Sequence, residues 1–113
     1  MKSKNNLQQI HQIMGRKWNI LIIGTLSGNK MRFKDLKTEI SDISDRVLSQ
    51  RLLEMERMNI IKRNVYTGIP IKIEYGLTIK GQDLEKIFSE LIEWEKTYFE
   101  NYKYGEIIIV ENG

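Results

Sequence analysis

The spacing of apolar residues changes from a helical period to a period of two and back, and this change constrains the fold more than any other feature of the chain. Apolar residues recur every three or four positions from Leu7 to Met58, alternate with polar residues from Ile71 to Leu77, and return to helical spacing after Thr78. A helical period indicates one-sided helices, and a period of two indicates a half-buried strand. The sequence therefore predicts several helices, a short β-structure and a last helix.

Four helices are predicted ahead of the strands, and turn residues separate them. Gly15 and the segments 27–29 and 41–43 interrupt the helical pattern. Ser44 can cap the fourth helix at its start, and Asn59 suits the left-handed conformation that ends many helices. Leu7, Ile10, Ile13 and Met14 form the apolar face of a short amphipathic helix. The residues predicted to face the core are Trp18, Leu21, Ile22, Thr25, Leu26, Phe33, Leu36, Ile40, Val47, Leu48, Leu52, Met55 and Met58.

A β-hairpin and a long helix complete the predicted order. Strand-forming residues fill 60–66 and 71–77, and the segment 67–70, Thr-Gly-Ile-Pro, predicts the turn between them. This order predicts an α+β, mostly α fold, namely a winged helix-turn-helix with a two-stranded β-hairpin wing and extra helices at both ends. We expect a single domain over 1–113, with an N-terminal dimerisation helix (5–14), a winged-helix core (15–78), a C-terminal dimerisation helix (79–104) and a tail (105–113).

Size and composition limit the alternatives. A chain of 113 residues fits one compact domain, and the absence of cysteine excludes disulfides, thiolate metal ligands and thiol switching within it. The longest near-continuous apolar stretch, 20–26, is too short to span a membrane, and the N-terminus lacks the apolar core of a signal peptide. We therefore expect a cytoplasmic protein that needs no cofactor.

Charge is distributed unevenly along the chain. Residues 1–81 carry 15 Lys or Arg and 7 Asp or Glu, a net charge of +8, whereas residues 82–113 carry 3 and 8, a net charge of −5. A basic body attracts a polyanion such as DNA, and an acidic C-terminal segment is better placed away from phosphates. Charge alone leaves open the alternative of a merely solvated surface.

The last predicted helix carries more apolar surface than one domain can bury. Apolar residues cover nearly half of its circumference up to Tyr102, and at 1.5 Å per residue it is about 37 Å long. Its first turns can close the domain core, and its distal turns predict a homodimer contact. The residues expected at that contact are Leu7, Ile10, Leu91, Trp94, Tyr98, Phe99 and Tyr102. The apolar run 107–110 either adds to a sheet edge or stays without structure.

The short turn 41–43 makes the helix after Ser44 the predicted recognition helix of a helix-turn-helix motif. At 100° per residue, Arg46, Ser49 and Gln50 point outward with Leu53 and Arg57, and arginine and glutamine suit guanine and adenine edges in the major groove. Phosphate contacts are expected from the residues around this helix and from the wing. The expected DNA-binding residues are Arg32, Lys34, Ser44, Asp45, Arg46, Ser49, Gln50, Arg51 and Lys72.

Two other functional classes fit the residues less well. An enzyme needs a nucleophile, a base or a metal site, and this chain offers one histidine, His11, which is expected to be a partly buried structural residue. The glutamates of the last helix are expected on its solvent face. A winged-helix module that binds a protein instead of DNA is the main alternative, because the same fold hosts both uses. Glu54 and Glu56 slightly weaken the case for DNA.

Several motifs in this order resemble those of the HxlR family of bacterial regulators. The resemblance covers about 7–94 and implies a dimeric DNA-binding regulator whose first and last helices form the subunit contact. The motifs are Gly15-Arg16-Lys17-Trp18, Arg32-Phe33-Lys34-Asp35-Leu36, Ile43-Ser44, Leu48-Ser49-Gln50-Arg51-Leu52, Arg63-Asn64-Val65-Tyr66, Ile69-Pro70 and Glu74-Tyr75-Gly76-Leu77-Thr78-Ile79-Lys80-Gly81.

One departure from the family pattern concerns the signal. Some members of the family sense electrophiles or oxidants through a cysteine near the start of the first helix, and here Asn5 holds that position. The resemblance then leaves an unidentified small-molecule effector, constitutive DNA binding or another kind of switch. Methionine oxidation is the less favoured switch, because methionines at helical spacing are usually core residues.

Overall fold

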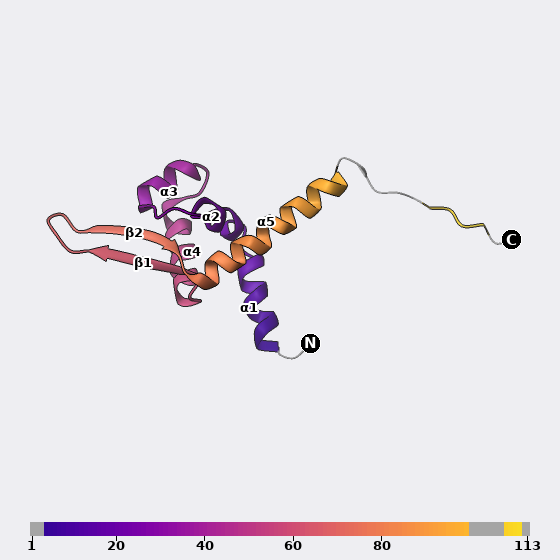
Figure 1. Cartoon of the computed structure of the whole chain (residues 1–113), viewed down its shortest axis with the longest axis horizontal. Coiled ribbons are helices and arrows are strands. Elements are labelled where there is room, and N and C mark those ends of the chain that lie inside the picture. The colour runs from indigo at the N-terminus through magenta and orange to yellow at the C-terminus, as the bar shows by residue number, and fades with distance from the viewer. Residues whose placement is uncertain (1–3, 100–107, 112–113) are drawn as a thin grey trace.

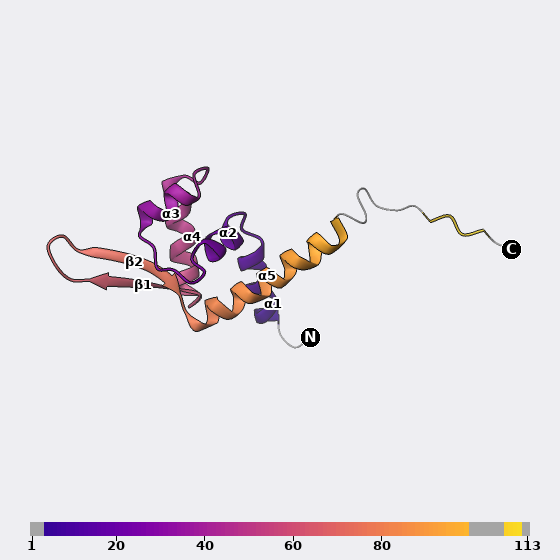
Figure 2. The same ribbon diagram turned by 45° about the horizontal axis from the view of Figure 1, so that its top comes forward.

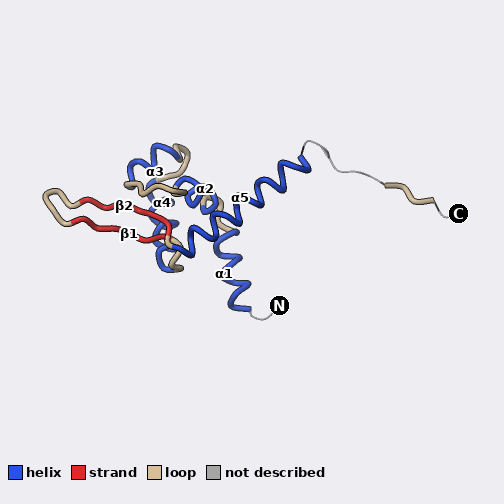
Figure 3. The backbone as a smooth tube through the Cα atoms, viewed as in Figure 1, coloured by secondary structure: helices blue, strands red, loops and turns tan. Residues whose placement is uncertain are grey.

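The structure is a computed structural model, which describes residues 4–99 and 108–111. Within these residues the chain forms five helices and one two-stranded sheet (Figures 1 and 3). The elements are α1 (Lys4–Met14), α2 (Asn19–Thr25), α3 (Phe33–Glu39), α4 (Asp45–Arg57), β1 (Ile61–Tyr66), β2 (Lys72–Leu77) and α5 (Ile79–Phe99). The predicted fold class, a mostly helical winged helix-turn-helix with a hairpin wing, is confirmed.

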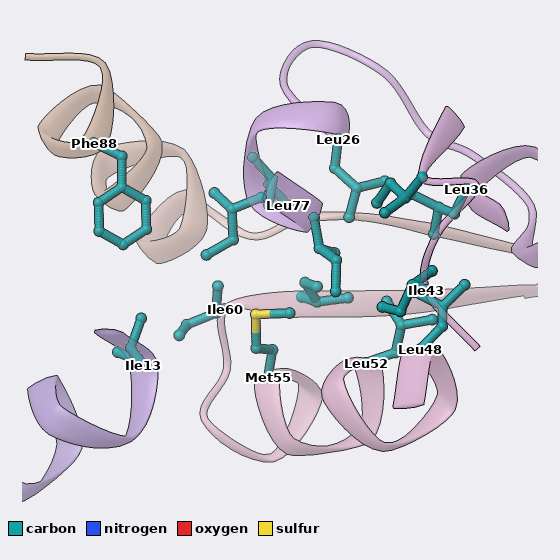
Figure 4. Close-up of a cluster of buried hydrophobic side chains, with 14 residues drawn as sticks. Ile13, Leu26, Leu36, Ile43, Leu48, Leu52, Met55, Ile60, Leu77 and Phe88 are labelled. Carbon is teal, nitrogen blue, oxygen red and sulfur yellow. The ribbon is translucent and has the colours of Figure 1, made fainter. Parts of the chain in front are cut away.

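A single cluster of buried apolar side chains joins the helices to the base of the wing (Figure 4). Leu36 of α3, Leu48 and Met55 of α4, and Ile60 at the start of the wing are fully buried. Most of the predicted inward residues of α3 and α4 lie in or against this cluster. Burial of each such side chain stabilises the fold by roughly 2 kcal/mol.

The buried face of α2 differs from the predicted one. Leu21 is half exposed, and the buried residues are Asn19, Ile22, Ile23 and Leu26. These four positions still lie on one face of the helix. Because Asn19 is polar, a search for apolar periodicity misses it and places the buried face of α2 at the wrong residues. The Asn19 side chain tolerates burial because its Nδ2 atom donates a 3.0 Å hydrogen bond to the Ile13 carbonyl.

A lysine holds the turn of the helix-turn-helix motif. The Lys37 ammonium of α3 donates a hydrogen bond to the Ile43 carbonyl and lies 3.7 Å from an Asp45 carboxylate oxygen. The Ser44 hydroxyl accepts a 3.1 Å hydrogen bond from the Val47 amide, which confirms the predicted cap of α4. The start of α4 is therefore tied to α3 by side chains as well as by packing.

The wing is an antiparallel hairpin in which Ile61 pairs with Leu77 and Tyr66 with Lys72. Met31, in the loop before α3, pairs with Tyr75 through two backbone hydrogen bonds of 2.7 and 2.9 Å. This bridge anchors the outer edge of β2 to the helical body. Ile71, which was predicted to open the second strand with a half-buried side chain, instead precedes β2 and is exposed.

α5 leaves the body in the direction opposite to the wing (Figures 1 and 2). The Thr78 hydroxyl accepts a 3.0 Å hydrogen bond from the Gly81 amide at its start. Phe88 is buried, whereas every residue from Ser89 to Phe99 is exposed. As predicted, only the first turns of this helix contribute to the core.

Parts of the predicted C-terminal region lie outside the described residues, among them 100–107 and therefore Tyr102. Residues 108–111 have no regular secondary structure, so this part of the expected apolar tail does not extend the sheet. Among the described residues, no helix is both long enough and apolar enough to cross a membrane.

Candidate nucleic-acid interface

α4 has one face buried in the core and one exposed face that is mostly polar. Leu48, Leu52 and Met55 are buried, and the side chains predicted to point outward are all exposed. These exposed residues are Arg46, Ser49, Gln50, Leu53 and Arg57. Arg46 and Arg57 form no ion pair with any residue that the structure describes. Their guanidinium groups are therefore available to an external acceptor.

The two glutamates that weaken the basic character of α4 in the sequence are neutralised in the structure. Glu54 lies 2.7 Å from Arg51 and 3.6 Å from Arg16 of the segment before α2. Glu56 lies 3.4 Å from Arg63 of the wing. Each carboxylate thus faces a guanidinium, and the exposed face carries less negative charge than the sequence of the helix indicates.

Arg51 differs from the other expected DNA contacts. Its side chain is only 14% exposed, and its guanidinium is engaged by Glu54. Its Nε atom is buried without a hydrogen-bond partner in the described residues. In this position the guanidinium group is not free to contact a phosphate, as was expected from the sequence. The Arg51 side chain instead pairs with Glu54 within α4.

The start of α3 and the second wing strand meet at a groove. Arg32, Phe33, Lys34, Ile71 and Ile73 line this groove, whose volume is about 300 Å³. Arg32 and Lys34 are exposed, and the Arg32 amide donates to an Asp35 carboxylate oxygen at 3.4 Å. The structure thus brings two of the expected basic residues next to the wing.

Lys72 of the wing is exposed but not isolated. Its ammonium lies 3.7 Å from a Glu74 carboxylate oxygen and 5.5 Å from the centre of the Tyr66 ring. Ser44 and Asp45, at the first turn of α4, are both exposed. These positions are compatible with backbone contacts near a helix N-terminus, where amide groups and the helix dipole favour an anion.

A contact between the wing and α4 was not foreseen from the sequence. Arg63 of β1, Glu56 of α4 and Tyr75 of β2 meet at the base of the wing. Burial raises the pKa of the Tyr75 phenol above its ordinary value, while Arg63 lowers this pKa and Glu56 raises it. The three residues come from three different elements, and their contact depends on how the wing packs against α4.

A second exposed surface, which we call the apolar face, combines α1 with the distal half of α5. The side chains of Leu7, Ile10 and Met14 are exposed on α1, and Leu91 and Trp94 are 42% and 58% exposed on α5. A groove of about 420 Å³ lies between α1 and the first turns of α5, where Leu84 and Ile87 line it. The other exposed apolar residues of α5 are Ile87, Ile92, Tyr98 and Phe99.

His11 does not have the environment expected for it. The side chain is exposed in the protomer, not partly buried, because Ile13 and not His11 faces the core from α1. Among the described residues, no group of three or more His, Asp or Glu side chains could hold a metal ion.

The fold and the exposed face of α4 define the class of winged helix-turn-helix regulators. Residues 13–103 match the HxlR-like helix-turn-helix family, and the chain belongs to this family.

Curated relatives are named as transcriptional regulators. The regulator YodB of Bacillus subtilis is 35% identical over 94 residues, which cover 83% of this chain and 84% of YodB. An uncharacterised regulator of Methanothermobacter thermautotrophicus is 39% identical over 85 residues, which cover 75% of this chain and 65% of that protein. Both relatives are named as HTH-type transcriptional regulators.

The solved structure of the reduced form of YodB superposes with a TM-score of 0.78 and 34% identity, covering 89% of this chain and 98% of the YodB chain. YodB has also been solved after diamide treatment and with bound quinone. The similarity of fold therefore extends over both the helix-turn-helix and the terminal helices.

Proposed function

We propose that the chain acts as a homodimeric DNA-binding transcriptional regulator, in which α4 enters the major groove of a pseudo-palindromic operator. The observation that carries this proposal is the exposed face of α4, where Arg46, Ser49 and Gln50 project from a helix whose other face is fixed in the core. Arginine and glutamine each form paired hydrogen bonds with a base edge, so they can distinguish one sequence from another.

The remaining expected contacts would position the protein on the backbone. Arg32, Lys34 and Lys72 lie at the start of α3 and on the wing, and Ser44 and Asp45 lie at the start of α4. Contacts from such residues set register and orientation without reading sequence. We assign Arg51 a supporting role, since Glu54 already occupies its guanidinium.

The apolar face supports the homodimer. Leu7 and Ile10 of α1 and Leu91, Trp94, Tyr98 and Phe99 of α5 leave an extended apolar surface uncovered in one protomer. Such a surface is costly in water, and pairing two copies would cover it. In this arrangement 15–78 acts as the DNA-binding core, and the helices before and after it, 5–14 and 79–104, act as the dimerisation elements.

The signal that controls the regulator cannot be a thiol of this chain, because the sequence contains no cysteine. The structures of YodB are described as reduced, diamide-treated and quinone-bound. This chain would therefore respond by different chemistry, and a small-molecule effector is the simplest form of control.

A salt series tests the proposal. The full chain is titrated against a labelled random duplex by fluorescence anisotropy at several salt concentrations. A protein that binds phosphates loses affinity steeply as salt rises, because binding releases condensed cations from DNA. Negligible binding at low salt, or an affinity that does not change with salt, would instead favour a winged-helix module that binds another protein.

A further inference from the structure

A groove at the base of the wing contains three lysines that have no acidic partner. Lys30 comes from the loop between α2 and α3, Lys62 from β1 and Lys86 from α5, and together they line a volume of about 410 Å³. Within the described part of the chain, none of them lies within 4.0 Å of a carboxylate oxygen. Three lysines that line one groove concentrate positive charge there, and a bound anion would offset that charge.

Gly76 keeps the space between two of these lysines open. It pairs with Lys62 across the sheet, and a Cβ atom at this position would lie 3.3 Å from Lys30 Cγ and 3.8 Å from Lys62 Cε. Gly76 does not have a positive φ, so the backbone does not require glycine there. A longer side chain at position 76 would occupy the groove.

The rest of the lining is suited to a ligand that is partly apolar. Leu26 and Leu77, which are buried, lie at the base of the lining, and Asn29 and Gln82 add neutral polar groups. Glu85 is the acidic residue of the lining, and its Oε1 atom accepts a 3.0 Å hydrogen bond from Ser89. The groove is therefore lined by three lysines together with leucine and neutral polar side chains.

We propose that this groove binds a small organic anion, a carboxylate or phosphate attached to an apolar part, and that this anion is an effector of the regulator. The effector role rests on the proposed function, whereas binding of the anion does not. A ligand held by both Lys62 and Lys86 would connect the wing directly to α5.

The groove is separate from the proposed DNA surface. Arg63 reaches Glu56 of α4 from one face of the wing, and side chains alternate along a strand, so Lys62 projects from the opposite face. Lys72 shares the face of Lys62 but lies at the other end of β2, beside Tyr66, whereas Lys62 pairs with Gly76 at the base of the wing. The groove thus lies apart from the exposed face of α4, and for this reason we favour a small anion over a DNA phosphate.

The groove is also separate from the apolar face. At 100° per residue around α5, Gln82 lies about 180° and Lys86 about 140° from Leu91. Lys86 lies only about 80° from Trp94 but about 12 Å from it along the helix axis, so the site faces away from Leu91 and is separated from Trp94 along α5. It nevertheless contacts both the wing and the helix proposed for dimerisation.

The binding test uses backbone amide NMR of the full chain titrated with benzoate and with phenyl phosphate, and with uncharged benzamide as the control ligand. We expect saturable shifts at Gly76, Leu77 and Lys86 with at least one anion and none with benzamide. Lys62→Gln and Lys86→Gln should each weaken binding by about tenfold, as for the loss of one hydrogen bond to a charged group. Which anion binds more tightly distinguishes a carboxylate ligand from a phosphate ligand.

Two further variants control this test. Lys96→Gln removes the same charge from a distant part of α5, and Gly76→Leu fills the groove while keeping all three lysines. We expect Lys96→Gln to bind the anion as the unchanged protein does and Gly76→Leu to lose binding. The absence of saturable shifts with either anion, or an equal loss in Lys96→Gln, would overturn the site.

The effector role is tested on DNA at constant ionic strength, with sodium chloride replacing the anion in the control. We expect the anion to change DNA affinity in the unchanged protein and not in Lys62→Gln. A bound anion that leaves DNA affinity unchanged would overturn the effector role. A loss of DNA affinity in Lys62→Gln without any anion would show that the groove contacts DNA phosphates instead. The proposed function itself is judged separately, by the DNA affinity of the unchanged protein without anion.

Discussion

The backbone of Gly81 passes directly against the carbonyl group of Ile60, so a Cβ atom at position 81 would overlap the Ile60 oxygen and lie 3.2 Å from its carbonyl carbon. The same carbonyl accepts hydrogen bonds from the Thr78 amide at 3.0 Å and from the Thr78 hydroxyl at 3.1 Å. The start of α5 is therefore fixed against the turn that joins α4 to the wing, and this contact sets the direction in which α5 leaves the body.

A matched pair of glycine substitutions tests this contact. Gly81→Ala should lower the free energy of unfolding by about 2 kcal/mol or more, because backbone atoms must move apart to admit the methyl group. Gly24→Ala, within α2, should raise it by up to about 1 kcal/mol, since nothing lies within 4 Å of the added Cβ and alanine favours a helix. Urea unfolding of both variants measures the difference. Equal effects would show that the Gly81 contact is not tight.

Lys37 offers a test of the helix-turn-helix turn. Lys37→Gln should lower the free energy of unfolding by about 1 to 2 kcal/mol, because the Ile43 carbonyl loses a charged donor and Asp45 loses its nearby cation. The control is Lys34→Gln, which removes an exposed charge from the same helix. Thermal unfolding that affects both variants alike would argue against a specific role for Lys37.

Base reading is tested at Arg46. Arg46→Ala should weaken binding to a selected operator by about 1 to 3 kcal/mol and relax the preference at one base pair, because a base-edge contact is lost. Lys34→Ala should instead weaken binding to cognate and scrambled duplexes by the same factor. Competition gel shifts measure both ratios. An identical loss on both duplexes for Arg46→Ala would place Arg46 on the backbone rather than on a base.

The apolar face is tested by the state of association. Truncation after Ile92 should yield monomers with poor DNA affinity, because two half-sites one helical turn apart require two joined modules. Trp94→Glu should act in the same direction, whereas Lys96→Glu, on the opposite side of α5, should not. Sedimentation velocity gives the mass of each variant. A truncated chain that still sediments as a dimer would contradict the proposed role of Trp94, Tyr98 and Phe99 in the subunit contact, and a dimeric Trp94→Glu variant would do the same for Trp94.

Tyr75 predicts a loss of stability at alkaline pH. Its pKa is raised in the folded state, mainly by burial, so folding favours the neutral phenol. The associated stability is present below the ordinary pKa of 10.0 and is lost as pH rises through the higher folded value. Denaturant unfolding from pH 8 to pH 11 should therefore show a steeper decline for the unchanged protein than for Tyr75→Phe. Parallel curves would contradict the raised pKa.

The order of the elements could be read from the sequence because it depends on local rules. Period and turn residues predicted the helices, the hairpin and the long last helix, and local capping chemistry predicted Ser44 at the start of α4 and Asn59 at its end, where φ is 60°. The same periodicity predicted that Arg46, Ser49 and Gln50 point outward, and all three are exposed.

Only the tertiary structure decided how distant segments modify these elements. Asn19 became a core residue because the Ile13 carbonyl satisfies it, and the charges of Glu54 and Glu56 were offset by Arg16, Arg51 and Arg63. The lysine groove exists because a loop, a strand and a helix converge over Gly76. Local propensity and periodicity act over a few residues, whereas burial and charge pairing depend on which segments meet in space, and that information is absent from any single stretch of the chain.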